Sequence, residues 1–379
     1  MGNRYPLLLS PGNLGRLTLD NHMIMSPMTR FRIDLKGVPL ASNATYYSQR
    51  ASAGLIITES AYIEPRGIQD SLTAGIHSAA QVSGWSEVSA AVHGQGGRVF
   101  CQLAHAGRLS HSSLQPDGAL PIAPSPTADG VKIRVKGEED SIVRYEDGEI
   151  PRELAQDEIQ DLVKEHGRAA RRAINAGFDG VELHAGSGHL LRQFLEPCSN
   201  HRKDKYGGSA IKRCRFVIET VEEVVDSIGK QQVGIKISPN FSYGGMKGSL
   251  ESIRETYAAL CAALAAFDLA YIHVQRPMLN MQFGPQDYDP VRHIRALYRS
   301  NMLAGGNFNR HSGEQALREG ICDFIVFGRR FLANPDLPTR FELDAPENSW
   351  DDSTLYTHTD TGFLDYPALS CAEKAKYRS

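Results

Sequence analysis

Short apolar runs alternate with longer amphipathic segments along most of the chain. The short runs are rich in β-branched residues and apolar almost throughout, which is typical of strands buried on both faces of a parallel sheet. The longer segments repeat apolar residues at i, i+3, i+4 and i+7, which predicts helices at Gln156–Ala176, Ile211–Ile228 and Ser249–Ala266. The runs predict strands at His22–Ser26, Leu55–Ser60, Arg98–Leu103, Gly180–His184, Val233–Ser238, Leu269–Gln275, Met302–Gly306 and Phe324–Gly328.

Strand–helix units that follow one another in a single chain predict an α/β fold, a (β/α)8 TIM barrel preceded by an N-terminal hairpin. We expect residues 1–379 to form one domain. A doubly wound sheet is the rival fold, because Gly186-Ser-Gly188 follows a strand and opens a helix, like the start of a dinucleotide fingerprint. The third glycine is missing, and the motif comes at the fourth strand rather than the first, so the barrel is favoured.

The connection between the third and fourth predicted strands is far longer than any other. Within about residues 110–151, Val131–Val135 and Ser141–Tyr145 alternate apolar with polar residues, and Lys-Gly-Glu-Glu-Asp separates them. This pattern predicts a β-hairpin. Because the segment follows the C-terminal end of a barrel strand, we expect it to lie over the barrel mouth as a lid. The alternative is a solvated excursion without a role.

The composition narrows the class of protein. Lys and Arg number 41 against 44 Asp and Glu, giving a net charge of −3, which argues against a broad nucleic-acid-binding surface. No apolar stretch approaches the roughly 18 residues that span a bilayer, and the N-terminus lacks the apolar core of a signal peptide. The 6 cysteines are far apart, which suggests neither disulfides nor a metal site. We expect a cytoplasmic globular protein without membrane, nucleic-acid or metal partners.

Polar residues recur where the predicted strands end. Catalytic residues of a barrel lie at these C-terminal ends, so their convergence on one rim predicts a site. Gly306 after the seventh strand and Gly328-Arg329 after the eighth suit a phosphate bound by backbone N–H groups and one guanidinium. The alternative is that these glycines only make tight turns.

The same strand ends carry a family resemblance, which runs from about Leu9 to Leu369. The chain resembles the Old Yellow Enzyme family of FMN-dependent ene-reductases. The carrying segments are Met25-Ser-Pro-Met-Thr-Arg30, Gln102-Leu-Ala-His-Ala-Gly-Arg108, Asn175-Ala-Gly-Phe-Asp-Gly-Val-Glu-Leu-His184, Leu190-Leu-Arg-Gln-Phe-Leu-Glu-Pro197, Asn200-His-Arg-Lys-Asp-Lys-Tyr-Gly-Gly-Ser209, Phe327-Gly-Arg-Arg-Phe-Leu-Ala-Asn-Pro-Asp336 and Gly362-Phe-Leu-Asp-Tyr-Pro367.

The resemblance implies non-covalent FMN at the barrel mouth, with NADPH or NADH as reductant. Lys236 stands where the family usually has Arg beside the flavin N1 and O2 atoms, and Tyr356 matches a tyrosine of the substrate pocket. These residues have alternative, purely structural roles. Thr29 can cap a turn, Gln102 can hydrogen-bond to nearby backbone groups, and Lys236 can pair with Glu182. The flavin-binding positions that the resemblance implies are Pro27, Met28, Thr29, Ser60, Gln102, Lys236, Gly306, Gly328 and Arg329.

The substrate positions depart from the family pattern. The family commonly uses His and Asn to bind the substrate carbonyl and a tyrosine to protonate the α-carbon, but this chain has His184, Ser187 and His189. His184 can still donate to the oxygen, whereas Ser187 is shorter than Asn. His189 is a proton donor or, alternatively, a supporting or helix-capping residue. Ala104 replaces a residue that is often a bulky aromatic, so we expect an enlarged pocket.

These features predict an FMN-dependent NAD(P)H oxidoreductase that reduces the C=C bond of an α,β-unsaturated carbonyl compound. The Ala104 position favours a bulky or secondary-metabolite substrate. We expect a monomer or homodimer. The altered proton-donor position leaves two alternatives open: a flavin-dependent desaturase or isomerase on the same fold, or a flavin-binding protein without turnover.

Overall fold

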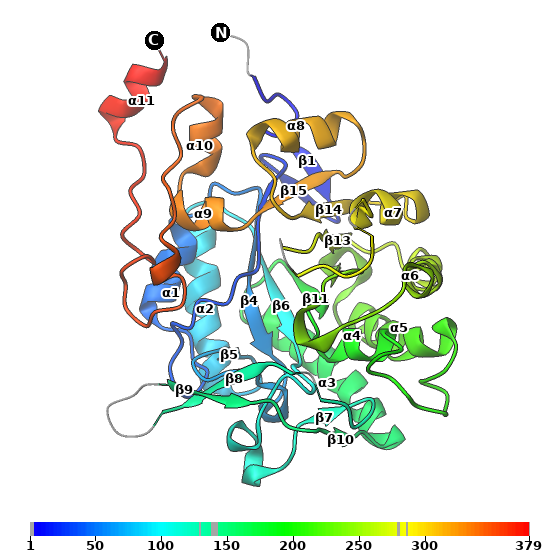
Figure 1. The fold of residues 1–379 in the computed structure, drawn as a ribbon. Helices are drawn as coiled ribbons and strands as arrows, with labels where there is room; N and C mark the ends of the chain where they lie inside the picture. The colour runs from blue at the N-terminus through cyan, green and yellow to red at the C-terminus, as the bar shows by residue number, and fades with distance from the viewer. Residues whose placement is uncertain (1–3, 129, 138–142, 279–280, 286, 379) are drawn as a thin grey trace.

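A computed structural model describes residues 4–128, 130–137, 143–278, 281–285 and 287–378. The barrel strands are all parallel, and the last of them pairs with the first, so the sheet closes on itself (Figure 1). The predicted (β/α)8 barrel is therefore confirmed. Its strands are β3 Met23–Met25, β4 Leu55–Tyr62, β6 Val99–Ala104, β11 Gly180–Ala185, β12 Val233–Ile237, β13 Tyr271–Gln275, β14 Met302–Gly305 and β15 Phe324–Phe327.

Helices follow the barrel strands and cover the outside of the sheet, as Figure 1 shows. The three predicted helices are found close to their expected bounds, because their apolar stripes face the sheet. The helices are α1 Ala41–Ser48, α2 Ala79–Gly94, α3 Gln156–Asn175, α4 Leu190–Leu195, α5 Ala210–Ile228, α6 Leu250–Leu264, α7 Pro290–Leu297, α8 Arg310–Arg318, α9 Arg329–Ala333, α10 Leu337–Glu342 and α11 Cys371–Arg378.

The barrel interior is apolar near its N-terminal end. Ile24, Leu55 and Phe100 pack there with other inward side chains of the strands. The predicted N-terminal hairpin is present as β1 (Gly12–Leu14) and β2 (Leu17–Leu19), which pair antiparallel, and its Leu14 and Leu19 complete this cluster. The hairpin therefore closes one end of the barrel, and polar side chains can gather only at the other end.

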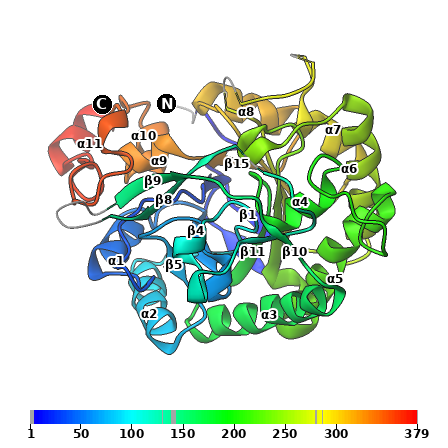
Figure 2. The same cartoon turned by 60° about the horizontal axis from the view of Figure 1, so that its bottom comes forward.

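The long insertion after β6 forms the predicted hairpin. Its described strands are β8 (Lys132–Lys136) and β9 (Val143–Asp147), and residues 138–142, which include the first two positions of the predicted second strand, lie outside the described chain. Arg134 of β8 exchanges backbone contacts with the loop after β4: its N–H donates to Asp70 Oδ1 at 2.9 Å and its carbonyl accepts from Ser71 N at 2.8 Å. The hairpin thus lies at the C-terminal end of the barrel (Figures 1 and 2).

Three short strands complete the region around this end. β7 (Ile122–Ala123) and β10 (Arg152–Glu153) pair in parallel at the base of the insertion, and β5 (Ala74–Gly75) adds to the edge of β4. Among the described residues, no helix is both long and apolar enough to cross a membrane.

Candidate active site

A chain of hydrogen bonds crosses the barrel one layer below its mouth. Ser60 Oγ donates to Gln102 Oε1 at 2.7 Å, and Gln102 Nε2 donates to Glu182 Oε1 at 2.7 Å. Glu182 Oε2 in turn contacts His273 Nδ1 at 2.9 Å. The chain forms because Ser60, Gln102 and Glu182 occupy paired positions of the adjacent strands β4, β6 and β11, and His273 reaches Glu182 from β13, across β12. The Gln102 side chain is thus oriented by other side chains, and its backbone N–H donates to Thr58 Oγ1.

Glu182 keeps its charge in this buried layer. Burial alone would raise the pKa of the Glu182 carboxyl, but His273, Lys236 and the amide of Gln102 together hold that pKa below its ordinary value. Glu182 and His273 were not among the residues chosen from the sequence. Polar residues on the inward side of predicted strands were the available signal, since the alternation of each strand places them beside Gln102 and Lys236.

Lys236 lies between His184 and His273 in the register of three strands, and it is buried. Burial lowers the pKa of its ammonium group, while the charge of Glu182 acts in the opposite direction. The alternative of an ion pair between Lys236 and Glu182 is not supported, because the carboxylate oxygens meet Gln102 and His273 instead. Lys236 is thus a buried amine beside the mouth, at the position where the sequence predicts a contact with flavin.

His184 and His189 come together at the mouth, their ring centroids 4.1 Å apart. His184 Nδ1 accepts the backbone N–H of Gly186 at 3.3 Å, so the proton of the neutral ring lies on Nε2. Burial lowers the pKa of His184 well below its ordinary value, and the neighbouring His189 and Lys236 lower it further. His184 is therefore a neutral imidazole whose Nε2–H is available to a substrate oxygen.

His189 is also neutral, because burial lowers its pKa to about 4. It occupies the N-cap position of α4, but its side chain makes no capping hydrogen bond. Neither ring nitrogen has a hydrogen-bond partner among the described residues, although both atoms are buried. The helix-capping alternative is thus not supported for the imidazole, and its polar atoms are left for a ligand.

The loop that carries Ser187 is held by hydrogen bonds to Ser238 and Gln193. Ser187 adopts a left-handed conformation with φ 47°, and its N–H donates to Ser238 Oγ at 2.8 Å. Gln193 of α4 donates to the carbonyls of Ala106 and Gly188, both at 2.8 Å, and so ties the loops after β6 and β11 together. The strand ends bearing Gln102 and His184 are therefore held at a constant separation.

Pro27, Met28 and Thr29 form a half-buried segment at the end of β3. Its course is set by Arg30, whose N–H donates to the buried carboxylate of Glu59 at 3.2 Å. Burial raises the pKa of Glu59 to about 7. No hydrogen bond to the described residues occupies the side chain of Thr29, so the turn-capping alternative is not supported.

Gly306 and Gly328 lie at the ends of the adjacent strands β14 and β15, next to Arg329. Gly306 has φ 120°, and a Cβ added there would lie 2.5 Å from the Cβ of Arg276. A Cβ on Gly328 would lie 3.4 Å from Met28 Sδ. The exposed guanidinium of Arg329 lies 5.8 Å from the ring of Trp350. The two strand ends therefore leave bare backbone beside one cation.

Tyr356 lies on the outer rim of the mouth, with 55% of its surface exposed. Its ring meets Phe31 edge-on at 5.6 Å, and its carbonyl accepts from Arg134 of the hairpin at 3.4 Å. Arg32 holds the surrounding segment through hydrogen bonds to the carbonyls of Thr354 and Thr361, each of 3.0 Å. Tyr356 is thus beside the mouth but does not meet His184 or His189.

The space around Ala104 differs from the sequence expectation. Ala104 is 1% exposed and packs with Tyr62, Ala106 and Leu109 in a small apolar cluster. The missing aromatic at this position does not by itself leave an open pocket, because Tyr62 fills the neighbouring volume. Tyr62 escaped the sequence analysis, although it stands two residues beyond Ser60 and so points to the same side of β4.

A parallel barrel with a buried lysine, neutral imidazoles and bare glycine backbone around its mouth has the layout of a barrel enzyme that binds a phosphate-bearing ligand. Comparison with known proteins identifies the family. Residues 7–348 match the model of the NADH:flavin oxidoreductase / NADH oxidase family, and the chain belongs to that family. The predicted kinship with Old Yellow Enzyme is confirmed.

Relatives match the chain over nearly its whole length. The protein named 12-oxophytodienoate reductase 1 from Oryza sativa subsp. japonica is 36% identical over 96% of this chain and 93% of its own. The solved structure of morphinone reductase has a TM-score of 0.92 and 38% identity, covering 98% of this chain and 99% of that one. The old yellow enzyme homologue from Zymomonas mobilis has a TM-score of 0.89 and 35% identity, with 96% and 100% covered.

The chain is an FMN-dependent NAD(P)H oxidoreductase that acts on activated C=C bonds. A solved complex of morphinone reductase with tetrahydroNAD supports the nicotinamide reductant. The residues at the mouth fit the flavin: His273 Nε2 is buried without a partner among the described residues, and a Cβ on the adjacent Gly305 would lie 3.1 Å from that nitrogen. Bare backbone at Gly306 and Gly328 suits the phosphate.

Proposed function

We propose that the enzyme reduces cyclic α,β-unsaturated ketones, with His184 as the residue that binds the carbonyl oxygen. The hydrogen bond from Gly186 N–H to His184 Nδ1, 3.3 Å long, carries this proposal, because it leaves the Nε2 proton for the substrate. A donor that faces the growing negative charge on the oxygen stabilises the enolate-like transition state. Since His184 is neutral and its Nδ1 accepts from Gly186, its one N–H, on Nε2, is the donor to the oxygen.

FMN, when bound, supplies the hydride chemistry that links the nicotinamide to the C=C bond. The residues that would hold its isoalloxazine are Pro27, Met28, Thr29, Ser60, Gln102 and Lys236, and those that would hold its phosphate are Gly306, Gly328 and Arg329. Lys236 would place a positive charge beside the pyrimidine edge of the ring. The fixed orientation of Gln102 favours this arrangement, since Ser60 and Glu182 already determine which way its amide faces.

His189 would deliver the proton to the α-carbon as a neutral imidazole. Both of its ring nitrogens lack a partner in the described chain, and it stacks on His184 at 4.1 Å. Ser187 would add a hydroxyl, directly or through a water, beside the carbonyl oxygen. Tyr356 would line the outer part of the substrate pocket, and the hairpin of β8 and β9 would cover the mouth as a lid.

Residues 1–379 would act as one FMN-binding domain, with nicotinamide and enone taking turns at the same face of the site. We also place the enzyme in the cytoplasm, as a monomer or homodimer. The near balance of 41 basic and 44 acidic residues and the scattered cysteines support this placement.

A second candidate function is desaturation or isomerisation. The feature that favours it is His189, because a neutral imidazole can accept a proton as well as donate one. The reduction consumes one NADPH and one proton for each C=C bond that becomes a CH–CH bond. Desaturation instead needs an acceptor such as dioxygen, and isomerisation consumes no reductant overall.

Anaerobic stoichiometry separates these functions. Purified yellow enzyme is supplied with NADPH and 2-cyclohexen-1-one without oxygen, and cyclohexanone is quantified by gas chromatography. We expect one cyclohexanone for each NADPH oxidised. NADPH oxidation that requires air and yields no cyclohexanone would contradict the proposal, and conversion of cyclohexanone to the enone under air would favour the second function.

A further inference from the structure

Tyr62 of β4 and Ala104 of β6 occupy paired positions on two adjacent strands. The register pairs Ser60 with Gln102 and, two residues further along each strand, Tyr62 with Ala104. Side chains two residues apart on a strand point to the same side, so Tyr62 and Ala104 face the barrel axis as Ser60 and Gln102 do. They lie roughly 6–7 Å closer to the mouth than that pair. Tyr62 therefore stands directly above residues proposed to contact the flavin.

The ring of Tyr62 occupies the volume that the methyl group of Ala104 leaves free. Tyr62 is 2% exposed and shares an apolar cluster with Ala104, Ala106 and Leu109. Its backbone is fixed as well, because its carbonyl accepts from Ile76 N at 2.9 Å. Leu109 belongs to the cluster and Ile68, Val131 and Tyr243 pack against it, so at the paired positions of β4 and β6 the large side chain comes from β4 and the small one from β6.

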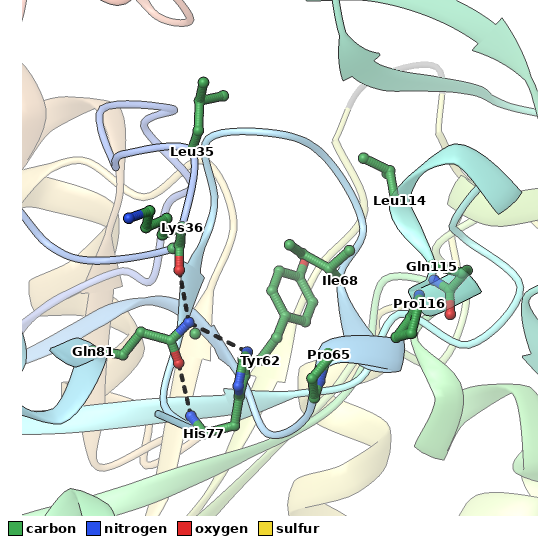
Figure 3. A pocket seen from close by; sticks show the side chains of 12 residues that line it. Leu35, Lys36, Tyr62, Pro65, Ile68, His77, Gln81, Leu114, Gln115 and Pro116 are labelled. Carbon is green, nitrogen blue, oxygen red and sulfur yellow. Dashed lines mark hydrogen bonds between the residues drawn. The ribbon is translucent and has the colours of Figure 1, made fainter. Parts of the chain in front are cut away.

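Tyr62 also lines a side pocket of about 290 Å³ (Figure 3). Tyr62 belongs both to the lining of this pocket and to the Ala104 cluster, whereas Ala104 does not line the pocket. Tyr62 thus lies between the pocket and the Ala104 cluster, together with Ile68, which also lines the pocket and packs against the cluster. The apolar side chains of the pocket are those of Leu35, Pro65, Ile68, Leu114 and Pro116.

The Tyr62 side chain is uncharged. Burial raises the pKa of the Tyr62 phenol well above its ordinary value, and Asp70 raises it further, so the hydroxyl keeps its proton. Between the pocket and the Ala104 cluster, Tyr62 therefore acts through the bulk of its ring rather than through a charge.

We propose that Tyr62 determines the size of the accepted substrate. Its ring replaces the bulk missing at Ala104 and closes the substrate site against the side pocket. The native enzyme therefore favours compact enones, and removal of the ring would let an apolar substituent enter the pocket. This inference rests on the proposed function, and it reverses the expectation of a bulky substrate that Ala104 alone suggested.

Two enones with the same reacting bond test the size limit. The ratio of kcat/KM for 5-phenyl-2-cyclohexen-1-one to that for 2-cyclohexen-1-one is measured in the wild-type enzyme, Tyr62→Ala and Tyr62→Phe. We expect Tyr62→Ala to raise the ratio at least tenfold and Tyr62→Phe to leave it within twofold, since Phe keeps the ring. A ratio unchanged in Tyr62→Ala would overturn the proposal.

Exchanging the two side chains between the strands gives a second test. The variant Tyr62→Ala/Ala104→Tyr moves the ring from β4 to β6 and should return the kcat/KM ratio to within threefold of the wild-type value. Ala104→Tyr alone should lower Tm by more than it does in the presence of Tyr62→Ala, because two rings compete for one space. Additive changes in Tm would contradict shared space.

The two tests separate the inference from its premise. A wild-type enzyme that binds FMN but reduces neither enone would contradict the proposed function, while the Tm cycle would still decide whether Tyr62 and Ala104 share one space. Reduction of 2-cyclohexen-1-one with an unchanged ratio would contradict only the role of Tyr62.

Discussion

The two halves of the barrel mouth are built differently. On the flavin side, Ser60, Gln102, Glu182 and His273 form a continuous chain of hydrogen bonds. On the substrate side, His189 is buried with both ring nitrogens unpartnered among the described residues. A satisfied network is rigid, and unsatisfied buried donors cost free energy that a ligand can recover. The flavin side thus has a continuous hydrogen-bonded chain with one buried nitrogen left over, His273 Nε2, whereas on the substrate side both nitrogens of His189 remain for a ligand.

Removal of His184 should have the largest effect on turnover. In His184→Ala, we expect the rate of reoxidation by 2-cyclohexen-1-one to fall about 10²- to 10³-fold, the loss typical of one oxyanion donor. Stopped-flow absorbance of the flavin checks this rate. The protein should remain yellow, and His184→Asn, which keeps an N–H donor, should lose less. Loss of FMN from His184→Ala would show that His184 belongs to the flavin half.

Gly306→Ala should produce the next largest effect, this time on the flavin half. The added Cβ would collide with Arg276 and occupy the bare backbone proposed for the phosphate, so we expect the Kd for FMN to rise roughly 10- to 100-fold. Fluorescence titration of the apoprotein measures it. Gly229→Ala is the matched control, because Gly229 has φ 91° and nothing within 4 Å of an added Cβ. Equal weakening in both variants would mean that backbone strain, not the phosphate site, is responsible.

Glu182→Gln should weaken the flavin half more gently. The amide cannot accept from both Gln102 and His273 as the carboxylate does, so the orientation of Gln102 is lost. We expect the Kd for FMN to rise about tenfold, in line with one buried group left unsatisfied. Glu314→Gln is the control, since buried Glu314 binds the backbone of Leu7 and Leu8 instead. It should lower Tm without changing the Kd, and a similar Kd change in both variants would contradict the network.

The smallest predicted effect is a pH dependence from the substrate half. His189 has a pKa of about 4 when folded against an ordinary value of 6.5, so below pH 6.5 the unfolded chain binds a proton that the folded chain rejects. The contribution of neutral His189 to the free energy of unfolding is therefore present above pH 6.5 and is lost as the pH falls below it. When the pH is lowered from 6.5 to 5.5, the free energy of unfolding should therefore fall by about 1 kcal/mol less in His189→Phe than in the wild type. Urea unfolding at both pH values checks this, and parallel losses would contradict it.

Much of the fold could be predicted from the chain because its signals are local. Continuous apolar runs such as Phe324–Gly328 and the stripe of Gln156–Ala176 depend only on which faces are buried, and both elements appear near their predicted bounds. The hairpin was placed at the correct end, but alternation alone did not predict that its second strand continues to Asp147.

The site was less predictable, because packing between strands decided it. The importance of Ala104 depended on Tyr62, which lies on another strand and is linked to it only through the register. Glu182 was recognised only as a possible partner of Lys236, whereas its partners are Gln102 and His273. The chemical type of each residue was visible in the sequence, but which residue meets which was not.

Anaerobic stopped-flow spectroscopy tests whether the reduced enzyme transfers its electrons to an enone. The yellow protein is reduced with one equivalent of NADPH and then mixed with 2-cyclohexen-1-one in the absence of oxygen. We expect rapid return of the oxidised flavin spectrum, because His184, Ser187 and His189 suffice to bind and protonate the enone. Rapid reduction by NADPH followed by reoxidation only in air would contradict it, since the flavin half would work while the substrate half did not accept an enone.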